Sequence, residues 1–305
     1  MHHRIKQRHL RGFVEIARRK GLKPAAEAMN MTQPAVSKLL KDLEDILGST
    51  LFERDRSGAR LTEAGEVFLQ YADQSLAVLQ HGIASLEALK SGQAGQLRIG
   101  ALPSVAARFL PRAVMRFRDI AQGADLSIEQ GAHESLVAGL RSGALDLVVG
   151  RLGAPETMSG LSFTQVYSER VVFVSAADHP CAGASGIEGL ADWPVLYPPR
   201  AAAIRPSVDR LLVSLGAGAL PDRIETVSEP FGRAMVLGPA RAIWIISGGV
   251  VASEIEAGVM RAMDIDTEIT SGPVGIMARS EDEVLPLARL FRMAVLETAE
   301  AMELR

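Results

Sequence analysis

Between residues 33 and 47 the sequence carries polar and basic side chains whose spacing suits contact with a polyanion. Counted at 100° per residue, Pro34, Ser37, Lys38 and Lys41 fall on the face opposite the apolar side chains of one helix. Those apolar side chains are Val36, Leu39, Leu40, Leu43 and Leu47. Acidic residues come only from position 42 onward, and they would repel phosphates. The pattern therefore predicts that the N-terminal half of this helix enters a groove of a nucleic acid.

The residue types near this face determine what it could recognise. The side chain of Gln33 can hydrogen-bond bidentately to an adenine edge, and Pro34 can contact a thymine methyl group. Lys41 and Arg60 are predicted to bind phosphates, which position a protein on DNA without specifying the sequence. These residues together indicate base recognition supported by charge.

The charge of the chain is unevenly distributed. The 305 residues are 48% hydrophobic and 23% charged, and their formal net charge of −3 alone argues against nucleic-acid binding. Residues 1–41, however, hold ten Lys and Arg against two acidic residues, a net charge of +8, whereas residues 67–305 carry −7. A basic head on an acidic body predicts a polyanion-binding module, although a merely solvated basic face would give the same count.

Signals around the basic face predict a helix-turn-helix. Apolar residues three and four apart predict a helix over about residues 7–20, and a short alanine-rich helix follows over 24–29. Thr32 is placed to cap the third helix. Residues 51–61 are predicted to form a β-hairpin with a basic tip.

The segment 63–90 contains no proline, and its apolar residues are alternately three and four apart. This spacing predicts one long helix with a coiled-coil seam that joins two copies of the chain. The seam residues are Leu69, Ala72, Leu76, Leu79, Ile83 and Leu86. A single helix packed on its own domain remains the alternative.

Residues 25–65 contain a series of short motifs in a fixed order: Ala25-Ala26, Thr32-Gln33-Pro34-Ala35-Val36-Ser37-Lys38, Leu43-Glu44, Leu47-Gly48, Leu51-Phe52-Glu53-Arg54 and Arg60-Leu61-Thr62-Glu63-Ala64-Gly65. These motifs resemble the winged helix-turn-helix of LysR-type transcriptional regulators, and Pro24 is a departure from the family pattern. The resemblance implies that the major groove is contacted by Gln33, Pro34, Ser37 and Lys38, with Thr32 beside them. It also implies that Arg54 and Arg56 approach the DNA backbone or the minor groove.

After residue 95, apolar β-rich runs alternate with helical patterns, which predicts a largely parallel α/β body. The expected strands are 97–101, 126–129, 146–150, 171–175, 195–197, 224–227, 242–247 and 274–278, and the expected helices lie near 105–118, 134–141, 206–215, 231–237, 248–257 and 284–303. The resemblance continues in Leu97-Arg98-Ile99-Gly100-Ala101, Leu110-Pro111 and Gly143-Ala144-Leu145-Asp146-Leu147. It implies a periplasmic-binding-protein-like effector domain with two lobes.

The expected organisation is an α/β multidomain chain with three parts. Residues 1–62 form the winged helix-turn-helix, 63–91 the linker and dimerisation helix, and 92–305 the effector domain. Lobe one comprises residues 92–166 and 268–305, and lobe two comprises residues 167–267.

Side chains at strand ends and helix starts are candidates for binding a small anion. Ser104 opens a helix where the resemblance places effector contacts, and Arg151 directly follows an expected strand. The further candidates are His133, Arg205, Ser228 and Phe231. Each position also has a purely structural interpretation: Ser104 as a helix cap, Arg151 as an ion pair between lobes, Arg205 as an exposed helix start, and His133 as a turn residue.

Further segments resemble, within the family, activators of protocatechuate-catabolic genes. They include Gly100-Ala101-Leu102-Pro103-Ser104-Val105, Ile204-Arg205-Pro206 and Trp244-Ile245-Ile246-Ser247. The resemblance implies an effector from the protocatechuate or β-ketoadipate pathway, a carboxylated ring-cleavage product such as β-carboxy-cis,cis-muconate. Arg151, Arg205 and Arg233 would suit such a polycarboxylate. The expected partners are a double-stranded DNA operator, a second copy in a homodimer or homotetramer, and RNA polymerase. The alternatives are a LysR-type activator or repressor for a different pathway, and a ligand-binding or enzyme body with a head that lacks operator specificity.

Other function classes lack their signatures. The sequence has no G-x-S-x-G, H-E-x-x-H or P-loop motif, and Pro221 stands near Gly216-Ala217-Gly218 where a dinucleotide site needs a third glycine. The single Cys181 has no partner for a disulfide, and His2 and His3 are terminal, so we expect neither a metal nor a cofactor. No run of 18 apolar residues and no signal peptide occurs, which predicts a soluble cytoplasmic protein.

Overall fold

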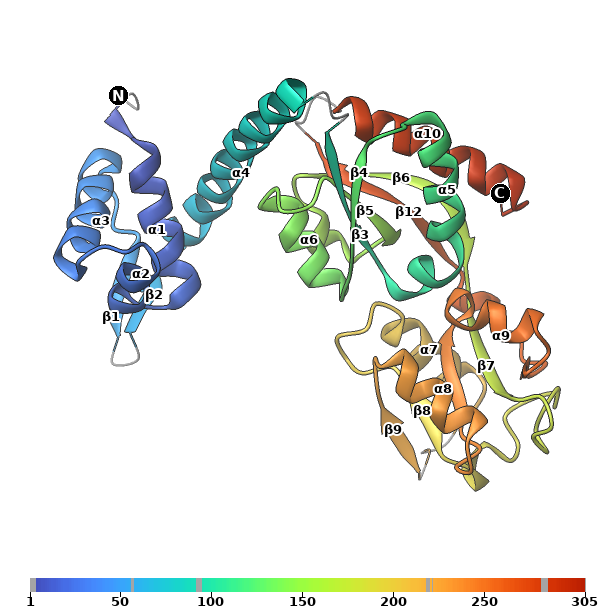
Figure 1. Ribbon diagram of the computed structural model, residues 1–305. Coiled ribbons are helices and arrows are strands. Elements are labelled where there is room, and N and C mark those ends of the chain that lie inside the picture. The colour runs from blue at the N-terminus through green and yellow to red at the C-terminus, as the bar shows by residue number, and fades with distance from the viewer. Residues whose placement is uncertain are drawn as a thin grey trace. The chain divides into compact units, whose positions relative to one another are not determined.

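The computed structural model describes residues 4–55, 58–91, 95–217, 220, 222–280 and 285–304 (Figure 1). The chain divides into two compact units, Met1–Gln93 with Arg141–Ala144 and Ala94–Leu140 with Leu145–Arg305. Each unit is considered by itself below.

The first unit is a three-helix module followed by a hairpin and a long helix. Its elements are α1 (Gln7–Arg19), α2 (Leu22–Ala28), α3 (Gln33–Leu47), β1 (Phe52–Asp55), β2 (Gly58–Leu61) and α4 (Glu63–Ser91). Phe13 is fully buried at the centre, and its ring lies 5.4 Å from the rings of both Phe52 and Phe68. Because these rings come from α1, β1 and α4, aromatic packing fixes the hairpin and the start of the long helix against the three helices.

The second unit contains two mixed sheets, and the first has the strand order β4-β3-β5-β12-β6. Its strands are β3 (Gln96–Ala101), β4 (Asp125–Gln130), β5 (Leu147–Arg151), β6 (Leu161–Glu169) and β12 (Gly272–Arg279). On one face α5 (Leu110–Ile120) and α10 (Pro286–Ala301) lie side by side, joined by an edge-on contact between Phe117 and Phe291. On the other face α6 (His133–Arg141) packs against Val148 and Met277. The inner strands β3 and β5 are therefore covered on both faces, whereas the edge strand β4 is largely exposed.

The second sheet has the order β11-β7-β10-β8-β9. Its strands are β7 (Val171–Ala176), β8 (Val195–Tyr197), β9 (Arg223–Glu225), β10 (Ile243–Ser247) and β11 (Met260–Ala262), and its helices are α7 (Arg205–Ser214), α8 (Glu229–Leu237) and α9 (Ala252–Glu256). The described part of the unit also contains the π-helical turn η2 (Val105–Phe109) and the 3-10 turns η3 (Pro155–Met158), η4 (Leu190–Asp192), η5 (Gly248–Val251) and η6 (Glu268–Thr270). The fully buried Trp244 marks one of the two cores of this sheet.

The sheets differ from the expected parallel arrangement. In each sheet three neighbouring strands are parallel, β4-β3-β5 and β9-β8-β10, and the remaining pairs are antiparallel. The antiparallel pairs arise because the chain passes from β6 directly into β7 in the other sheet and returns through η6 into β12. The two strands absent from the sequence prediction, β6 and β11, lie beside these crossovers.

Candidate functional site

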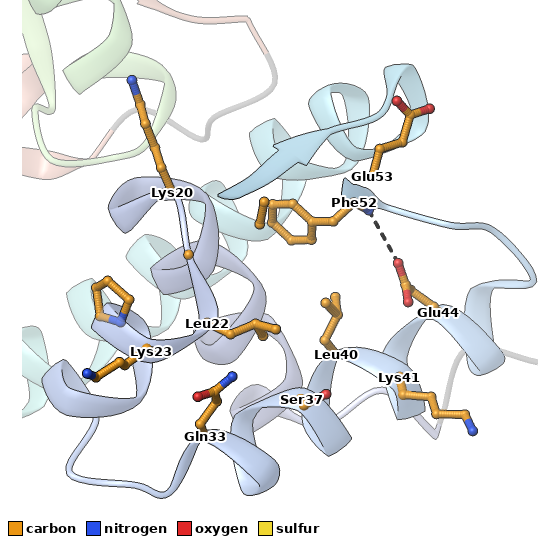
Figure 2. Close-up of a pocket in the computed structure, with 13 residues that line it drawn as sticks. Lys20, Leu22, Lys23, Gln33, Ser37, Leu40, Lys41, Glu44, Phe52 and Glu53 are labelled. Atoms are coloured by element: carbon orange, nitrogen blue, oxygen red, sulfur yellow. Dashed lines mark hydrogen bonds between the residues drawn. The ribbon is translucent and has the colours of Figure 1, made fainter. Parts of the chain in front are cut away.

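A groove on the first unit is lined by the turn between α1 and α2, by α3 and by the start of the hairpin (Figure 2). Its volume is about 660 Å³. The polar and charged residues that line it are Lys20, Lys23, Gln33, Ser37, Lys41, Glu44 and Glu53. Gln33, Ser37 and Lys41 are four residues apart on α3, so they form one line along the helix.

The predicted DNA contacts of α3 lie on its accessible face. Thr32, Gln33, Pro34, Lys38 and Lys41 are exposed, and Ser37 is half-buried. The opposite face of α3 is buried against the unit's core through Val36, Leu39 and Leu43. Thr32 precedes the helix in an extended conformation, and Pro34 occupies the first turn, where a missing amide costs no helix hydrogen bond. The hydrophobic core therefore holds this polar face outward.

Two lysines that sequence analysis did not single out border the groove. Lys20 has a left-handed backbone (φ 55°) at the end of α1, and its carbonyl oxygen accepts a hydrogen bond from the amide of Ala59 at 3.3 Å. Lys23 lies in the first turn of α2. The sequence showed only an excess of basic residues before position 42, and this excess did not predict that these two lysines in particular would lie beside α3.

The hairpin is antiparallel, as predicted, with Glu53 opposite the exposed Arg60. Glu44 anchors it to α3, because its Oε1 accepts hydrogen bonds from the amides of Leu51 (2.7 Å) and Phe52 (3.3 Å). Figure 2 shows the second of these bonds. Arg56 lies outside the described residues, as do the side chains of Arg54 and Leu86.

The predicted seam of α4 divides into two parts. Leu69 and Leu76 pack against the core of their own unit, and Ala72 between them is only 1% exposed. Leu79 and Ile83 are 46% and 48% exposed, and so are the neighbouring Val67, Tyr71 and Val78 to a similar or greater degree. The first part of the seam therefore packs on its own unit, as the single-helix alternative predicts. The second part leaves an exposed apolar surface that is suited to contact with a partner.

The second unit contains a cavity of about 270 Å³ between its two sheets. The lining residues follow the carboxyl ends of parallel strands, where open α/β sheets bind ligands: β3, β4 and β5 from one sheet and β8, β9 and β10 from the other. The lining includes Ser104, His133 and Arg151, three of the predicted effector residues. Most of the remaining wall is apolar: Leu102, Pro103, Pro198, Ala201–Ala203, Ile204, Val227, Ile246 and Val250.

Ser104 is held at a close approach between the two sheets. Its side chain hydrogen-bonds the carboxylate of Glu169, which also accepts the amide of Gly249 at 3.0 Å. A Cβ on Gly249 would lie 2.7 Å from the carbonyl oxygen of Ser104, so only glycine fits there. Burial raises the pKa of Glu169, whereas the bond from Ser104 and the charge of Arg151 oppose the increase.

Arg151 spans both chain crossovers. Its Nη1 donates to the carbonyl oxygen of Thr270 at 3.0 Å, and its Nη2 donates to the carbonyl oxygen of Glu169. Thr270 Oγ1 in turn accepts the amide of Val171 at 2.9 Å. Burial lowers the pKa of Arg151. The guanidinium is therefore held at the two crossovers by backbone carbonyls, and Arg151 also lines the cavity.

Three predicted effector residues do not line the cavity. Arg205 donates to Asp209 Oδ1 (2.8 Å) and Glu225 Oε1 (3.0 Å), and its guanidinium lies 4.7 Å from the ring centre of Tyr197. Ser228 caps α8 by accepting the amide of Phe231, whose side chain is 42% exposed. An effector role for Arg205, Ser228 and Phe231 thus stays a prediction without support from their position.

Arg233 is also engaged within its own lobe. It donates to Glu229 Oε2 at 3.2 Å, to Glu254, and to the carbonyl oxygen of Val250 at 2.7 Å. Of the three arginines expected to suit a polycarboxylate, Arg151 lines the cavity, whereas Arg205 and Arg233 do not. The polycarboxylate interpretation therefore stays a prediction that only Arg151 supports by its position.

Two lining residues were missed by sequence analysis. Gln130 Nε2 donates to Glu229 Oε1 at 2.8 Å, and the pair joins β4 of one sheet to α8 beside the other. Their positions are 99 residues apart, and neither residue type is unusual at a strand end or helix start, so nothing in the sequence pairs them.

Within the described part of the chain, no group of three or more His, Cys, Asp or Glu side chains is placed to hold a metal ion. The helices that the structure describes include none of the length and apolarity needed to span a bilayer.

Comparisons with known proteins cover both units. Residues 7–66 match the family model "Bacterial regulatory helix-turn-helix protein, lysR family", and residues 90–300 match "LysR substrate binding domain". The HTH-type transcriptional regulator PcaQ of Agrobacterium fabrum is 44% identical over 97% of this chain and 96% of its own.

Solved structures of full-length relatives share the fold. Full-length OxyR from Pseudomonas aeruginosa has a TM-score of 0.64 and 25% identity, covering 98% of this chain and 96% of its own. CbnR in complex with its target DNA has a TM-score of 0.65 and 20% identity, and the match covers 96% of this chain and 100% of CbnR. The expected fold class, a winged helix-turn-helix with a linker helix and a two-lobed effector domain, is confirmed. With both of its units matched by the family's own models, the chain belongs to the LysR family of DNA-binding transcriptional regulators, a family of regulators rather than enzymes.

Proposed function

We propose that this regulator activates genes of protocatechuate catabolism when a small carboxylate binds between the lobes of its effector domain. The observation that carries the proposal is the 44% identity to PcaQ over 97% of the chain. The cavity of about 270 Å³ is at the small end of ligand pockets, which suits an acid of single-ring size.

The proposed division of labour follows the domain boundaries expected from the sequence. Residues 1–62 bind a half-site through Thr32, Gln33, Pro34, Ser37 and Lys38, while Lys41, Arg54, Arg56 and Arg60 contact the DNA backbone or minor groove. Residues 63–91 join two copies through the exposed part of α4. Residues 92–305 bind the effector, with lobe one at 92–166 and 268–305 and lobe two at 167–267.

Effector control requires a difference in affinity between two arrangements of the lobes, because a ligand that binds both equally shifts nothing. The crossovers at residues 169–171 and 270–272 supply the hinge, and Arg151 bonds to carbonyl oxygens at both of them. Closure around an acid would change how two heads are placed on a two-fold symmetric operator, and thereby the access of RNA polymerase.

The test has two parts. A gel-shift titration of the purified chain against the intergenic DNA upstream of its own gene should show saturable binding that survives competitor DNA. A thermal-shift screen against acids of the protocatechuate pathway should raise the unfolding temperature. If the chain binds the upstream DNA specifically but responds only to acids of another pathway, the proposed pathway is wrong. If the upstream DNA gives no shift, the proposed operator recognition is contradicted.

A further inference from the structure

The hairpin braces the groove of the first unit, because it is hydrogen-bonded both to the α1–α2 turn and to α3. The carbonyl oxygen of Lys20 at that turn accepts the amide of Ala59 at 3.3 Å. The carboxylate of Glu44 on α3 accepts the amides of Leu51 and Phe52. The groove of about 660 Å³ is therefore held open by the unit's own bonds, and a preorganised site loses less entropy when it binds.

Two positive charges that line the groove are not paired within the described part of the chain. Arg19, directly before them, pairs with Glu15 at 3.0 Å. Lys20 and Lys23 are exposed, and neither has an ion pair or side-chain hydrogen bond among the residues that the structure describes. Both ammonium groups are thus available to an external anion such as a phosphate.

The hairpin contributes a charge of the opposite sign. Glu53 lines the groove and is exposed, and its carboxylate makes no hydrogen bond or ion pair with the described residues. Arg60, its partner across the hairpin, does not line the groove. Figure 2 shows Glu53 extending from the hairpin, whereas Lys20 and Lys23 extend from the α1–α2 turn and α2. A polyanion in the groove is therefore attracted by these lysines and repelled by Glu53.

Part of the lining is apolar. Leu22, Leu40 and Phe52 line the groove and are only half-buried, because each packs against the unit's core and leaves some surface exposed. Apolar surface beside unpaired lysines suits a ligand in which anionic groups alternate with apolar ones. The backbone of DNA has this composition, since deoxyribose rings separate its phosphates, and proteins contact both groups.

We propose that the groove seats the sugar-phosphate backbone of one DNA strand and thereby sets the register of α3 on the operator. Lys20 and Lys23 bind phosphates, the deoxyribose rings lie on the apolar lining, and Glu53 disfavours a shifted position of the strand. The two lysines are positioning residues, because they hold the strand beside which Gln33 and Ser37 contact bases. This inference rests on the proposed binding of an operator half-site by the first unit.

The first test compares salt dependence. The affinity of the full chain is measured at several salt concentrations for the intergenic DNA upstream of its gene and for a scrambled duplex. Lys20→Asn suits the left-handed backbone at that position (φ 55°), and Lys23→Gln keeps a long polar side chain. Each should reduce the slope of log affinity against log salt by about one on both duplexes.

Arg19→Gln is the matched control for the lysine variants. It removes a neighbouring positive charge that is paired with Glu15 and does not line the groove, so the slope should stay at the wild-type value. Thermal unfolding of each variant verifies that the first unit is folded. An equal loss of slope in Arg19→Gln would show a general effect of charge and would overturn the inference.

Glu53→Gln tests the exclusion of shifted positions. It should raise affinity for the scrambled duplex by about two- to fivefold more than affinity for the upstream DNA, as expected for one partly screened charge. The preference for the upstream DNA then falls by the same factor. An unchanged preference in the folded variant would overturn the role of Glu53.

A scan of neutral phosphates locates the strand. Single methylphosphonates replace the phosphates of the bound half-site one at a time on each strand. At a phosphate that Lys20 or Lys23 binds, neutralising the phosphate and substituting the lysine should together lose little more affinity than either change alone.

The outcomes separate this inference from the proposed function. Additive losses at every phosphate, or wild-type salt slopes in folded Lys20→Asn and Lys23→Gln, overturn the inference and leave operator binding through α3 standing. If the wild-type chain does not prefer the upstream DNA to the scrambled duplex, the proposed operator recognition and the inference fail together.

Discussion

At the scale of single residues, we propose that the first unit separates base recognition from charge. Gln33, Ser37 and Lys41 lie in one line on α3. The first two have hydrogen-bonding side chains suited to base edges, and Lys41 has a charge suited to phosphates. Lys20 and Lys23 add positive charge at the border of the groove. Substitutions at these positions should therefore fall into two distinct classes.

The first prediction contrasts the two classes. Gln33→Ala and Ser37→Ala should each weaken operator binding by about 1–3 kcal/mol and relax the sequence preference. Lys41→Ala should weaken binding to all DNA about equally and reduce the slope of log affinity against log salt by about one. Fluorescence anisotropy with operator and scrambled duplexes at several salt concentrations measures both. An equal loss of discrimination in all three variants would contradict the assignment.

A second residue-scale prediction concerns pH. His179 is 3% exposed, its Nδ1 accepts the amide of Cys181 at 3.0 Å, and its Nε2 donates to the carbonyl oxygen of Arg241 at 3.0 Å. The pKa of His179 lies below its ordinary value of 6.5, mainly because burial disfavours the charged ring. The folded state therefore favours the neutral ring. The unfolded state then binds more protons below about pH 6.5, and stability falls as the pH drops through that range.

Fluorescence isolates this effect, because both tryptophans of the chain, Trp193 and Trp244, lie in the second lobe and Trp193 contacts the His179 ring. Urea unfolding followed by tryptophan emission should give a lower free energy of unfolding at pH 5.5 than at pH 7.5. His179→Gln should flatten that dependence. The same slope in the variant would show that His179 does not cause it.

The residues of the cavity show what sequence reasoning could and could not reach. Ser104, His133 and Arg151 were predictable because strand ends and helix starts converge on one edge of a sheet. Arg205 also begins a helix, α7, but its side chain pairs with Asp209 and Glu225 and does not line the cavity. The contact between Gln130 and Glu229 depends on how the two lobes face each other, and no local pattern encodes that.

At the scale of elements, the segment after β10 fixes the junction of the lobes. Residues 248–251 form a tight turn that brings Gly249 against the carbonyl oxygen of Ser104 and the carboxylate of Glu169. Residues 105–109 form one turn of π-helix directly after Ser104. Irregular helix at this point is consistent with a functional position rather than a purely structural one.

The third prediction tests this junction. Gly249→Ala should destabilise the effector domain by about 1–3 kcal/mol, because the new methyl group would overpack against Ser104. Gly248→Ala is the matched control, since its nearest neighbour would be at an ordinary 3.5 Å. Differential scanning calorimetry should show a lower unfolding temperature for the first variant only. Equal unfolding temperatures would mean that the close approach is not required.

The fourth prediction concerns the exposed part of α4. Leu79→Asp places a charge among exposed apolar side chains and should dissociate the dimer that we propose. Ala72 is the contrasting position, because it is buried in the unit's own core and its substitution should affect stability first. Light scattering measures the mass, and an unchanged mass for the Leu79 variant would contradict this seam.

Strong local patterns made most elements predictable. The apolar runs of β3, β5, β7 and β10 and the periodic helices were evident in the sequence, as was the hairpin. The strand β6 was missed because Ser162, Thr164 and Gln165 interrupt its apolar pattern, and β11 has only three residues. The antiparallel placement of β12 follows from the return crossover, a long-range feature that periodicity does not contain.

At the scale of the whole molecule, charge is divided unevenly between the N-terminal segment and the rest of the chain. The net charge of −3 is the sum of a strongly basic N-terminal segment and an acidic body. Such a division attracts the head to DNA while the body, which holds the cavity, is not drawn to phosphates. Membership of the LysR family accounts for both parts in one chain.

The most direct test of the account is in vitro transcription from a promoter of protocatechuate-catabolic genes in the organism that carries this chain. RNA polymerase, the purified regulator and the pathway acid that raises the unfolding temperature most in the thermal-shift screen are supplied singly and together. The account predicts a several-fold increase in transcript only when the regulator and the acid are both present, and its loss with Gln33→Ala. Transcript that is independent of the acid or of the regulator would contradict it.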